Sequence, residues 1–149
     1  MVARTSASTT TGTSSKIEGN SPRGHGPLYA ARDPDDTHHD RARDELLRLQ
    51  AENIKVVVPY PILLESYSLV HHKLGNREAY ALLAEVTSTA ILTNPTTADY
   101  QDASVAILPY RDQDLTLFDT VLAAMSDRLE TPVWTFDHHF DVLRVDVWQ

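Results

Sequence analysis

The sequence predicts a single α/β domain in which a central parallel sheet is covered by helices on both faces. Helical and strand-like segments alternate from Pro27 onward, and this order is typical of parallel strands joined by right-handed crossovers. The strand-like segments are short and β-branched, as in strands that are buried on both faces. With 149 residues, 42% of them hydrophobic, the chain has room for one core and not for two.

Residues 1 to 25 differ in composition from the rest and are predicted to be a disordered or non-native tail. Nine of the first 15 residues are Ser or Thr, and the run to Arg23 has almost no apolar periodicity. Such a segment buries too little apolar surface to offset the entropy lost on ordering. An organelle transit segment has a similar composition, but we find no amphipathic helix in it. The domain is therefore expected to span residues 26 to 149.

The spacing of apolar residues, and the residues that typically begin or end helices, predict the position of each later helix and strand. The first long helix starts after Asp36 or Thr37, either of which can cap it, and it runs to about residue 50. Gly75 and Asn76 end the helix that follows Pro61. Further helices are expected at residues 77 to 87, 97 to 108 and 116 to 129, and strands at 55 to 59, 90 to 93, 132 to 136 and 143 to 148. The side chains expected to face the core from the helices include Ala42, Leu46, Leu47, Leu49, Ile62, Leu69, Leu74, Val105, Leu108, Phe118, Val121, Leu122 and Met125.

Charge and composition exclude several functions. The formal net charge of −8 argues against a protein that binds nucleic acid by phosphate neutralisation, although an enzyme that brings divalent cations to the phosphate escapes this objection. The chain has no Cys, so disulfides, thiolate zinc sites and cysteine nucleophiles are excluded. No run approaches the roughly 20 apolar residues of a membrane span, and the start lacks the apolar core of a signal peptide. We therefore expect a cytoplasmic protein without a membrane partner.

Three acidic residues form the candidate catalytic and metal-binding set: Glu65, Asp119 and Asp137. Glu65 lies early in the helix after strand 55 to 59, Asp137 ends strand 132 to 136, and Asp119 opens a helix. In parallel α/β folds, ligands bind beyond the carboxyl ends of the strands. Carboxylates gathered there repel one another unless a cation lies between them, and oxygen ligands of this kind suit Mg²⁺ or Mn²⁺. Such a cation can activate a water molecule and polarise a phosphate.

Each acid also has a purely structural interpretation. Thr116 and Asp119 fit a capping box, and an acid in the first turn of a helix is favoured by the helix dipole. Taken alone, Glu65 would be a solvated helix residue, and Asp137 a turn residue after a strand. The surroundings that the three acids share favour a common site.

These surroundings resemble the motifs of PIN-domain ribonucleases, which include the VapC toxins of type II toxin–antitoxin systems. The resemblance is carried by residues 59 to 67 (PYPILLESY), 115 to 124 (LTLFDTVLAA) and 133 to 140 (VWTFDHHF), and residues 26 to 39 (GPLYAARDPDDTHH) are similar to the first helix and loop of the family. It implies a PIN-like three-layer α/β/α domain and a nuclease site in which Glu65, Asp119 and Asp137 hold Mg²⁺ or Mn²⁺. It also implies an RNA substrate, a cognate antitoxin and frequent homodimerisation.

The chain departs from the family pattern before Gly26. Family members have a hydrophobic first strand that ends in a metal-binding Asp, and here the matching position is Gly24. The residues before Gly24 lack the apolar run of a central strand, so we expect that strand to be missing or replaced. Asp33, Asp35 and Asp36 lie beyond the first helix and are not expected to substitute for the missing acid, and His25 is a weaker candidate ligand. A misassigned, frame-shifted or rearranged start would explain the change.

Other polar residues near the acids have more modest expected roles. Thr135 is a candidate to orient a carboxylate or a water molecule from behind the metal ligands. The pairs His38-His39, His71-His72 and His138-His139 are expected to be structural or exposed, because adjacent histidines on a helix point about 100° apart. For His138 and His139 the alternative is contact with RNA or metal-bound water, because they follow Asp137. Arg111 and Arg144 are expected to be solvated.

Two functions other than a nuclease remain open on the sequence. One is a catalytically inactive PIN-like domain that binds RNA or an antitoxin-like partner, which the vacancy at Gly24 favours. The other is a nonfunctional gene remnant.

Overall fold

A computed structural model describes residues 15–18, 26–113 and 115–148, the first of these segments by its backbone alone. The elements in chain order are β1 (Ser15–Glu18), α1 (Pro27–Ala30), α2 (His39–Ala51), β2 (Lys55–Pro59), α3 (Tyr60–Leu74), α4 (Asn76–Thr89), β3 (Ile91–Thr93), α5 (Thr97–Ala106), the short 3₁₀ helix η1 (Leu108–Tyr110), α6 (Leu117–Leu129), β4 (Val133–Trp134) and α7 (His139–Val142). Within these ranges, no helix is long and apolar enough to cross a membrane.

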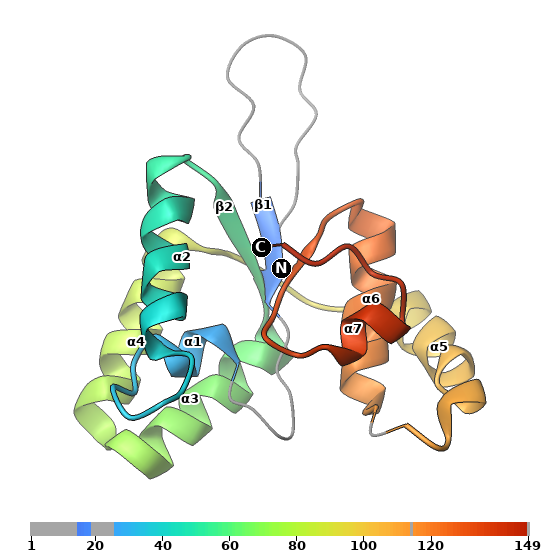
Figure 1. Ribbon diagram of the computed structural model, residues 1–149, viewed down its shortest axis with the longest axis horizontal. Coiled ribbons are helices and arrows are strands. Elements are labelled where there is room, and N and C mark those ends of the chain that lie inside the picture. Colours follow the sequence, from blue (N-terminus) through green and yellow to red (C-terminus); the bar gives the residue numbers. More distant parts are fainter. Residues whose placement is uncertain (1–14, 19–25, 114, 149) are drawn as a thin grey trace, which may run out of the picture.

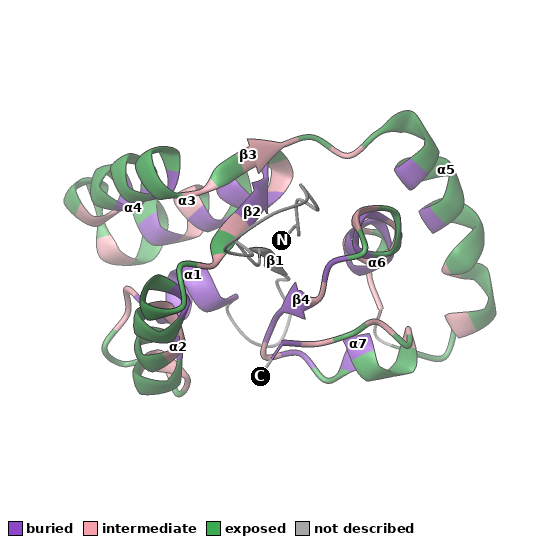
Figure 2. Cartoon of the chain, turned by 90° about the horizontal axis from the view of Figure 1, so that it is seen from above, coloured by how far each residue is buried: buried purple, intermediate pink, exposed green. Residues whose placement is uncertain are grey.

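The strands form one parallel sheet in the order β3-β2-β1-β4. Helices α1 to α4 lie on one side of this sheet and α5 to α7 on the other, as Figure 2 shows from above. Within the two helical layers, α3 packs against α4 and α5 against α6. The predicted α/β/α arrangement with a central parallel sheet is therefore confirmed.

Strand β1 lies in the middle of the sheet, where the sequence predicted a missing or replaced strand. Its Ile17 pairs with Val57 of β2 on one side and with Val133 of β4 on the other. Ser15–Glu18, which the sequence assigned to a disordered or non-native tail, thus form a strand. The physical reason is that a strand between two others satisfies its backbone N–H and C=O groups on both sides, which outweighs a weak local strand preference. The rest of the predicted tail lies outside the described residues.

The main core fills the space between the sheet and both helical layers. Val57 and Val58 of β2 and Val133 of β4 are at most 2% exposed. They pack with larger buried side chains from the helices, among them Ile62, Leu63, Leu82, Val121, Leu122, Met125 and Phe140. Each fully buried aliphatic side chain stabilises the fold by about 1.5–3 kcal/mol relative to its exposed state.

Strand β4 is also fixed from the side of α2. Trp134 is fully buried with Leu49 and Trp148, and its ring meets that of Trp148 edge to face at 6.4 Å. The indole N–H of Trp134 donates a hydrogen bond to the carboxylate of Glu45 on α2. This anchor holds the end of β4 in place, and Asp137 follows directly after it.

Helix α5 shows a different face to the core from the one predicted. Val105 and Leu108 were expected to point inward, but they are 69% and 53% exposed. The helix buries Ala103 and Asp99 instead. The carboxylate of Asp99 accepts two hydrogen bonds from Arg128 of α6, and this ion pair sets the rotation of the helix.

The strand predicted for residues 143 to 148 is reduced to one parallel bridge between Val133 and Val147. Helix α7 reverses the chain after β4, and Arg144 then takes a left-handed conformation with φ of 54°. A residue in that region interrupts an extended strand. The segment therefore covers β4 without extending the sheet.

Candidate metal centre

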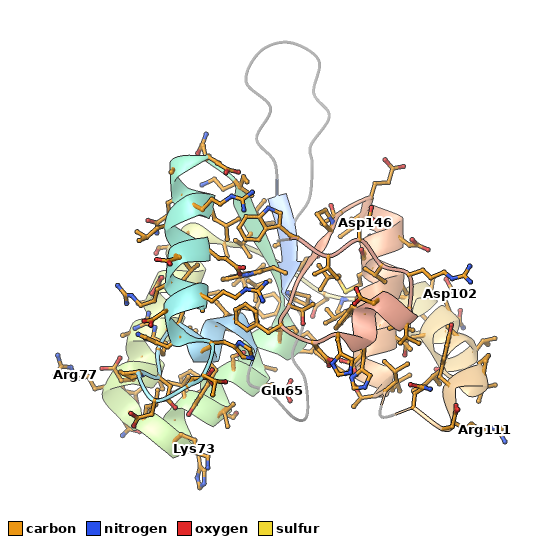
Figure 3. The ribbon with its side chains drawn as sticks, in the orientation of Figure 1. Glu65, Lys73, Arg77, Asp102, Arg111 and Asp146 are labelled. Carbon is orange, nitrogen blue, oxygen red and sulfur yellow. The ribbon has the colours of Figure 1, made fainter. Side chains whose placement is uncertain are left out.

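The predicted acids come from elements that end or begin at the same edge of the sheet. Strand β2 leads into α3, which carries Glu65, and β4 leads to Asp137. Helix α6 starts near this edge with Asp119 in its first turn. The edge is the lower one in Figure 1, and Glu65 is labelled there in Figure 3. It is the carboxyl end of the parallel strands, where sites form in such folds.

Asp119 caps α6 with one carboxylate oxygen and leaves the other free. Its Oδ2 accepts hydrogen bonds from the backbone N–H of Thr116 at 2.8 Å and from the Thr116 hydroxyl at 2.7 Å. The Asp119 N–H donates to the Thr116 Oγ1 at 3.2 Å, which completes the predicted capping box. Oδ1 is buried and has no hydrogen-bond partner in the described part of the chain. The structural interpretation of Asp119 and its role in a site are therefore compatible.

Asp137 is held in a tight turn after β4. Its N–H donates to the Oγ1 of Thr135 at 3.0 Å, and its Oδ1 accepts from the N–H of His139 at 2.9 Å. The residue is 7% exposed, and its buried Oδ2 lacks any partner among the residues that the structure describes. Two fixed points thus orient a carboxylate whose second oxygen remains available.

The two carboxylates interact electrostatically. Burial raises the pKa of Asp119 above its ordinary value of 3.8, and the negative charge of Asp137 raises it further. The hydrogen bonds from Thr116 and the charge of His139 oppose this rise in pKa without cancelling it. Bringing these two acids together therefore costs free energy that a bound cation offsets.

His139 lies beside Asp137 and interacts electrostatically with Asp119, whereas sequence reasoning gave it contact with RNA or metal-bound water as an alternative and not the role of a ligand. The residue is 9% exposed, and its Nδ1 is 2.8 Å from Oδ1 of Asp137 without a hydrogen bond between them. Its neighbour His138 is exposed, and the two rings are tilted by 32° with 4.3 Å between their centroids. Ligand atoms of Asp137, His138 and His139 all lie within 4.8 Å of one another. The sequence signal was the position of His139, two residues after a predicted ligand that ends a strand.

The other two predicted pairs behave as expected of structural or surface residues. His39 is half-buried, and its Nδ1 contacts the backbone carbonyl of Ala30 at 2.8 Å. His71 and His72 are exposed in the last turn of α3.

Glu65 is not joined to the other two acids. It is exposed on α3, and within the described ranges no hydrogen bond or ion pair links it to Asp119 or Asp137. The structure thus brings together two of the three predicted ligands and leaves the third at the rim. Thr135, the predicted supporting residue, contacts the backbone of Asp137 and not its carboxylate. Gly24 and His25 lie outside the described residues.

The residues present fit a divalent cation. Oδ1 of Asp119 and Oδ2 of Asp137 are buried acceptors without partners among the described residues, and buried polar atoms of this kind are rare unless an ion or water contacts them. Both are hard oxygen ligands, which suit Mg²⁺ or Mn²⁺.

The fold is a PIN-like α/β/α domain with a central parallel sheet. A solved protein of similar structure is VapC20 of Mycobacterium tuberculosis, a toxin that cleaves the sarcin-ricin loop. The TM-score is 0.70 with 18% sequence identity, and the match covers 83% of this chain and 94% of VapC20. At this identity the likeness shows a shared fold. No protein-family model and no curated protein sequence matches the chain.

Proposed function

We propose that this protein is a metal-dependent endoribonuclease that hydrolyses RNA phosphodiester bonds as the toxin of a type II toxin–antitoxin pair. The observation that carries this proposal is the pair of unpartnered, buried oxygens of Asp119 and Asp137 at the carboxyl edge of a PIN-like sheet. The shared fold of VapC20 supports the ribonuclease class.

In this proposal, Asp119 and Asp137 hold Mg²⁺ or Mn²⁺, and Glu65 adds a ligand from the rim. When bound, the cation supplies Lewis-acid activation of the phosphate and of the attacking water. The hydrogen bonds from Thr116 fix the Asp119 carboxylate before the cation arrives, and Thr135 fixes the turn at Asp137. A ligand set that is already fixed needs little reorganisation during the reaction.

RNA and a protein inhibitor are the proposed partners. With a net charge of −8, the chain needs the cation to attract RNA phosphates. Leu64 on α3 and Tyr80 on α4 are 65% and 60% exposed and are candidates to contact a cognate antitoxin or a second copy in a homodimer. Tyr67 on α3 is half-buried and stacks on His71. Action on RNA would place the protein in the cytoplasm.

The test is cleavage of an RNA panel by the purified chain in Mg²⁺ or Mn²⁺, with EDTA and Asp119→Asn as controls. Asn keeps an oxygen that can accept from Thr116, so the variant removes the charge and preserves the cap. Cleavage lost in EDTA and in Asp119→Asn supports the proposal. Asp99→Asn is the matched control, because Asp99 caps α5 in the same way but lies away from the site. Cleavage that survives Asp119→Asn contradicts the site.

A second candidate function is an inactive PIN-like domain that binds RNA or an antitoxin-like partner. The observation that favours it is Gly24, which offers no carboxylate where family members carry a metal-binding Asp. A folded sample that binds RNA in Mn²⁺ without cleaving it would identify this function.

A further inference from the structure

We propose that His139 is a nitrogen ligand of the metal centre, so that the site takes a first-row transition cation such as Mn²⁺ in preference to Mg²⁺. The inference rests on the proposed metal centre and adds to it a ligand that is not a carboxylate.

The position of the imidazole supports this role. Nδ1 of His139 is 2.8 Å from Oδ1 of Asp137 without a hydrogen bond between them. Neighbouring ligands of an octahedral ion with bonds of about 2.1 Å are about 3 Å apart. The imidazole of His139 therefore already lies at the distance of an adjacent ligand from the Asp137 carboxylate, whose free Oδ2 is the proposed ligand.

Burial supports the same conclusion. Three side-chain atoms in the described part of the chain are buried without a hydrogen-bond partner: Oδ1 of Asp119, Oδ2 of Asp137 and Nδ1 of His139. All three belong to residues that interact electrostatically with one another. Unsatisfied buried polar atoms each cost about 1–3 kcal/mol. A cation bound by Asp137 and His139, which have ligand atoms within 4.8 Å of each other, would remove two of these costs together.

His138 does not fit the role as well. Its side chain is 82% exposed, and its Nδ1 is 3.7 Å from Oδ1 of Asp137. An exposed ring must give up rotamer freedom to bind, whereas the buried ring of His139 is already held in place. The two adjacent histidines therefore offer one ligand and one natural control.

A mixed set of nitrogen and oxygen ligands changes the preferred cation. Mg²⁺ requires a nearly ideal octahedron and is bound through carboxylates, phosphates and water. Imidazole nitrogen suits first-row transition ions, whose affinity rises from Mn²⁺ onward. Replacing an acid at the missing position with His139 would therefore favour Mn²⁺ over Mg²⁺.

The direct test is pulsed EPR of Mn²⁺ bound to the full chain after metal removal. With natural isotopes, we expect ¹⁴N modulation at the Mn²⁺ signal, and with ¹⁵N-labelled histidine alone we expect it to change to ¹⁵N modulation. This measurement needs no variant and no RNA. Bound Mn²⁺ without nitrogen modulation overturns the proposal.

Two variants then identify which histidine supplies the nitrogen that binds Mn²⁺. His139→Asn should abolish the modulation and weaken Mn²⁺ binding at least about tenfold, the lower range for disturbing a metal site, while Mg²⁺ binding changes less than about twofold. His138→Asn should keep the modulation and the affinity. Loss of modulation in His138→Asn alone overturns the assignment. If His139→Asn does not fold, His138→Asn and the labelled wild-type chain still decide.

The outcomes separate this inference from the proposed function. Mn²⁺ that binds through Asp119 without nitrogen modulation overturns only the role of His139. Nitrogen modulation in a chain that cleaves no RNA overturns only the ribonuclease. Absence of any divalent binding overturns both.

Discussion

Asp99 and Asp119 occupy the same position in two equivalent capping boxes, but within the described residues only Asp99 forms an ion pair. Each is the third residue of its helix and exchanges hydrogen bonds with the N-cap Thr, Thr96 or Thr116. Arg128 donates to both oxygens of Asp99 at 2.9 Å and 2.8 Å. Asp119 faces another acid and keeps one oxygen free. The same local structure thus forms a structural clamp in one helix and leaves a carboxylate oxygen free at the candidate metal centre in the other.

The two acids should respond in opposite ways to removal of their charge. In EDTA at pH 7, Asp119→Asn should raise the free energy of unfolding by about 0.5–2 kcal/mol, the range of single stabilising substitutions, because repulsion from Asp137 disappears. Asp99→Asn should lower it by about 1–3 kcal/mol, because Arg128 loses a charged acceptor. Urea unfolding of both variants measures the difference. Destabilisation by Asp119→Asn would show that repulsion between Asp119 and Asp137 does not destabilise the fold.

The pH dependence of stability should also differ between these acids. Although burial raises the pKa of Asp99, the hydrogen bonds from Arg128 and Thr96 lower it more, so it lies below 3.8. Its contribution to stability is present above pH 3.8 and is lost as the pH falls through the lowered pKa. The pKa of Asp119 is raised, so its cost is fully present above that pKa and disappears as the pH falls toward 3.8.

Urea unfolding of wild type and of both variants, measured in EDTA across the acid pH range, tests the two opposite pH dependences. Wild type should have a higher free energy of unfolding than Asp99→Asn, and this difference should shrink only below pH 3.8. Asp119→Asn should have a higher free energy of unfolding than wild type, and this difference should already shrink above pH 3.8 as acid is added. Parallel curves for the two variants would contradict the assigned pKa directions.

Thr135 should matter for the site more than its small side chain suggests. Thr135→Val removes the oxygen that accepts from the N–H of Asp137 and leaves that buried donor unsatisfied. We expect a loss of about 1–3 kcal/mol in stability and a 10–100-fold loss of Mn²⁺ affinity, as for other residues that support metal ligands. Calorimetric titration with Mn²⁺ measures the affinity. The control is Thr131→Val, since Thr131 is equally buried but its hydroxyl bonds to Leu129.

Gly24→Asp tests the vacancy that the sequence reveals. If the family position has been lost, restoring a carboxylate should raise Mn²⁺ affinity and RNA cleavage at least about tenfold, because cation affinity rises with the number of charged ligands. Ser21→Asp adds the same charge nearby and should change neither. Equal effects of the two variants would mean that only the added charge matters.

Local patterns explain which elements the sequence predicts well. Neighbouring residues determine the β-branched strand Lys55–Pro59. They also determine the end of α3 at Gly75, which has φ of 91°. The capping box of Thr116 and Asp119 is equally local. Asp119 and Asp137 were identifiable because each sits at an element boundary within a recognisable motif.

Other features depend on contacts between distant residues. Nothing near Ser15–Glu18 signals a strand, since its pairing is supplied by β2 and β4. Val105 and Leu108 are exposed because the pairing of Asp99 with Arg128 sets the orientation of α5. His139 could not be distinguished from its exposed neighbour His138 before the fold had buried one of them.

The place of β1 in the sheet has a consequence for how the protein folds. Ile17 pairs with Val133, which lies far along the chain from it. During synthesis β1 therefore leaves the ribosome long before its partner β4. Until then the sheet cannot close, and Asp137 cannot reach Asp119. Contacts that span so much of the chain form slowly, so the candidate metal centre is expected to be among the last parts of the fold to form.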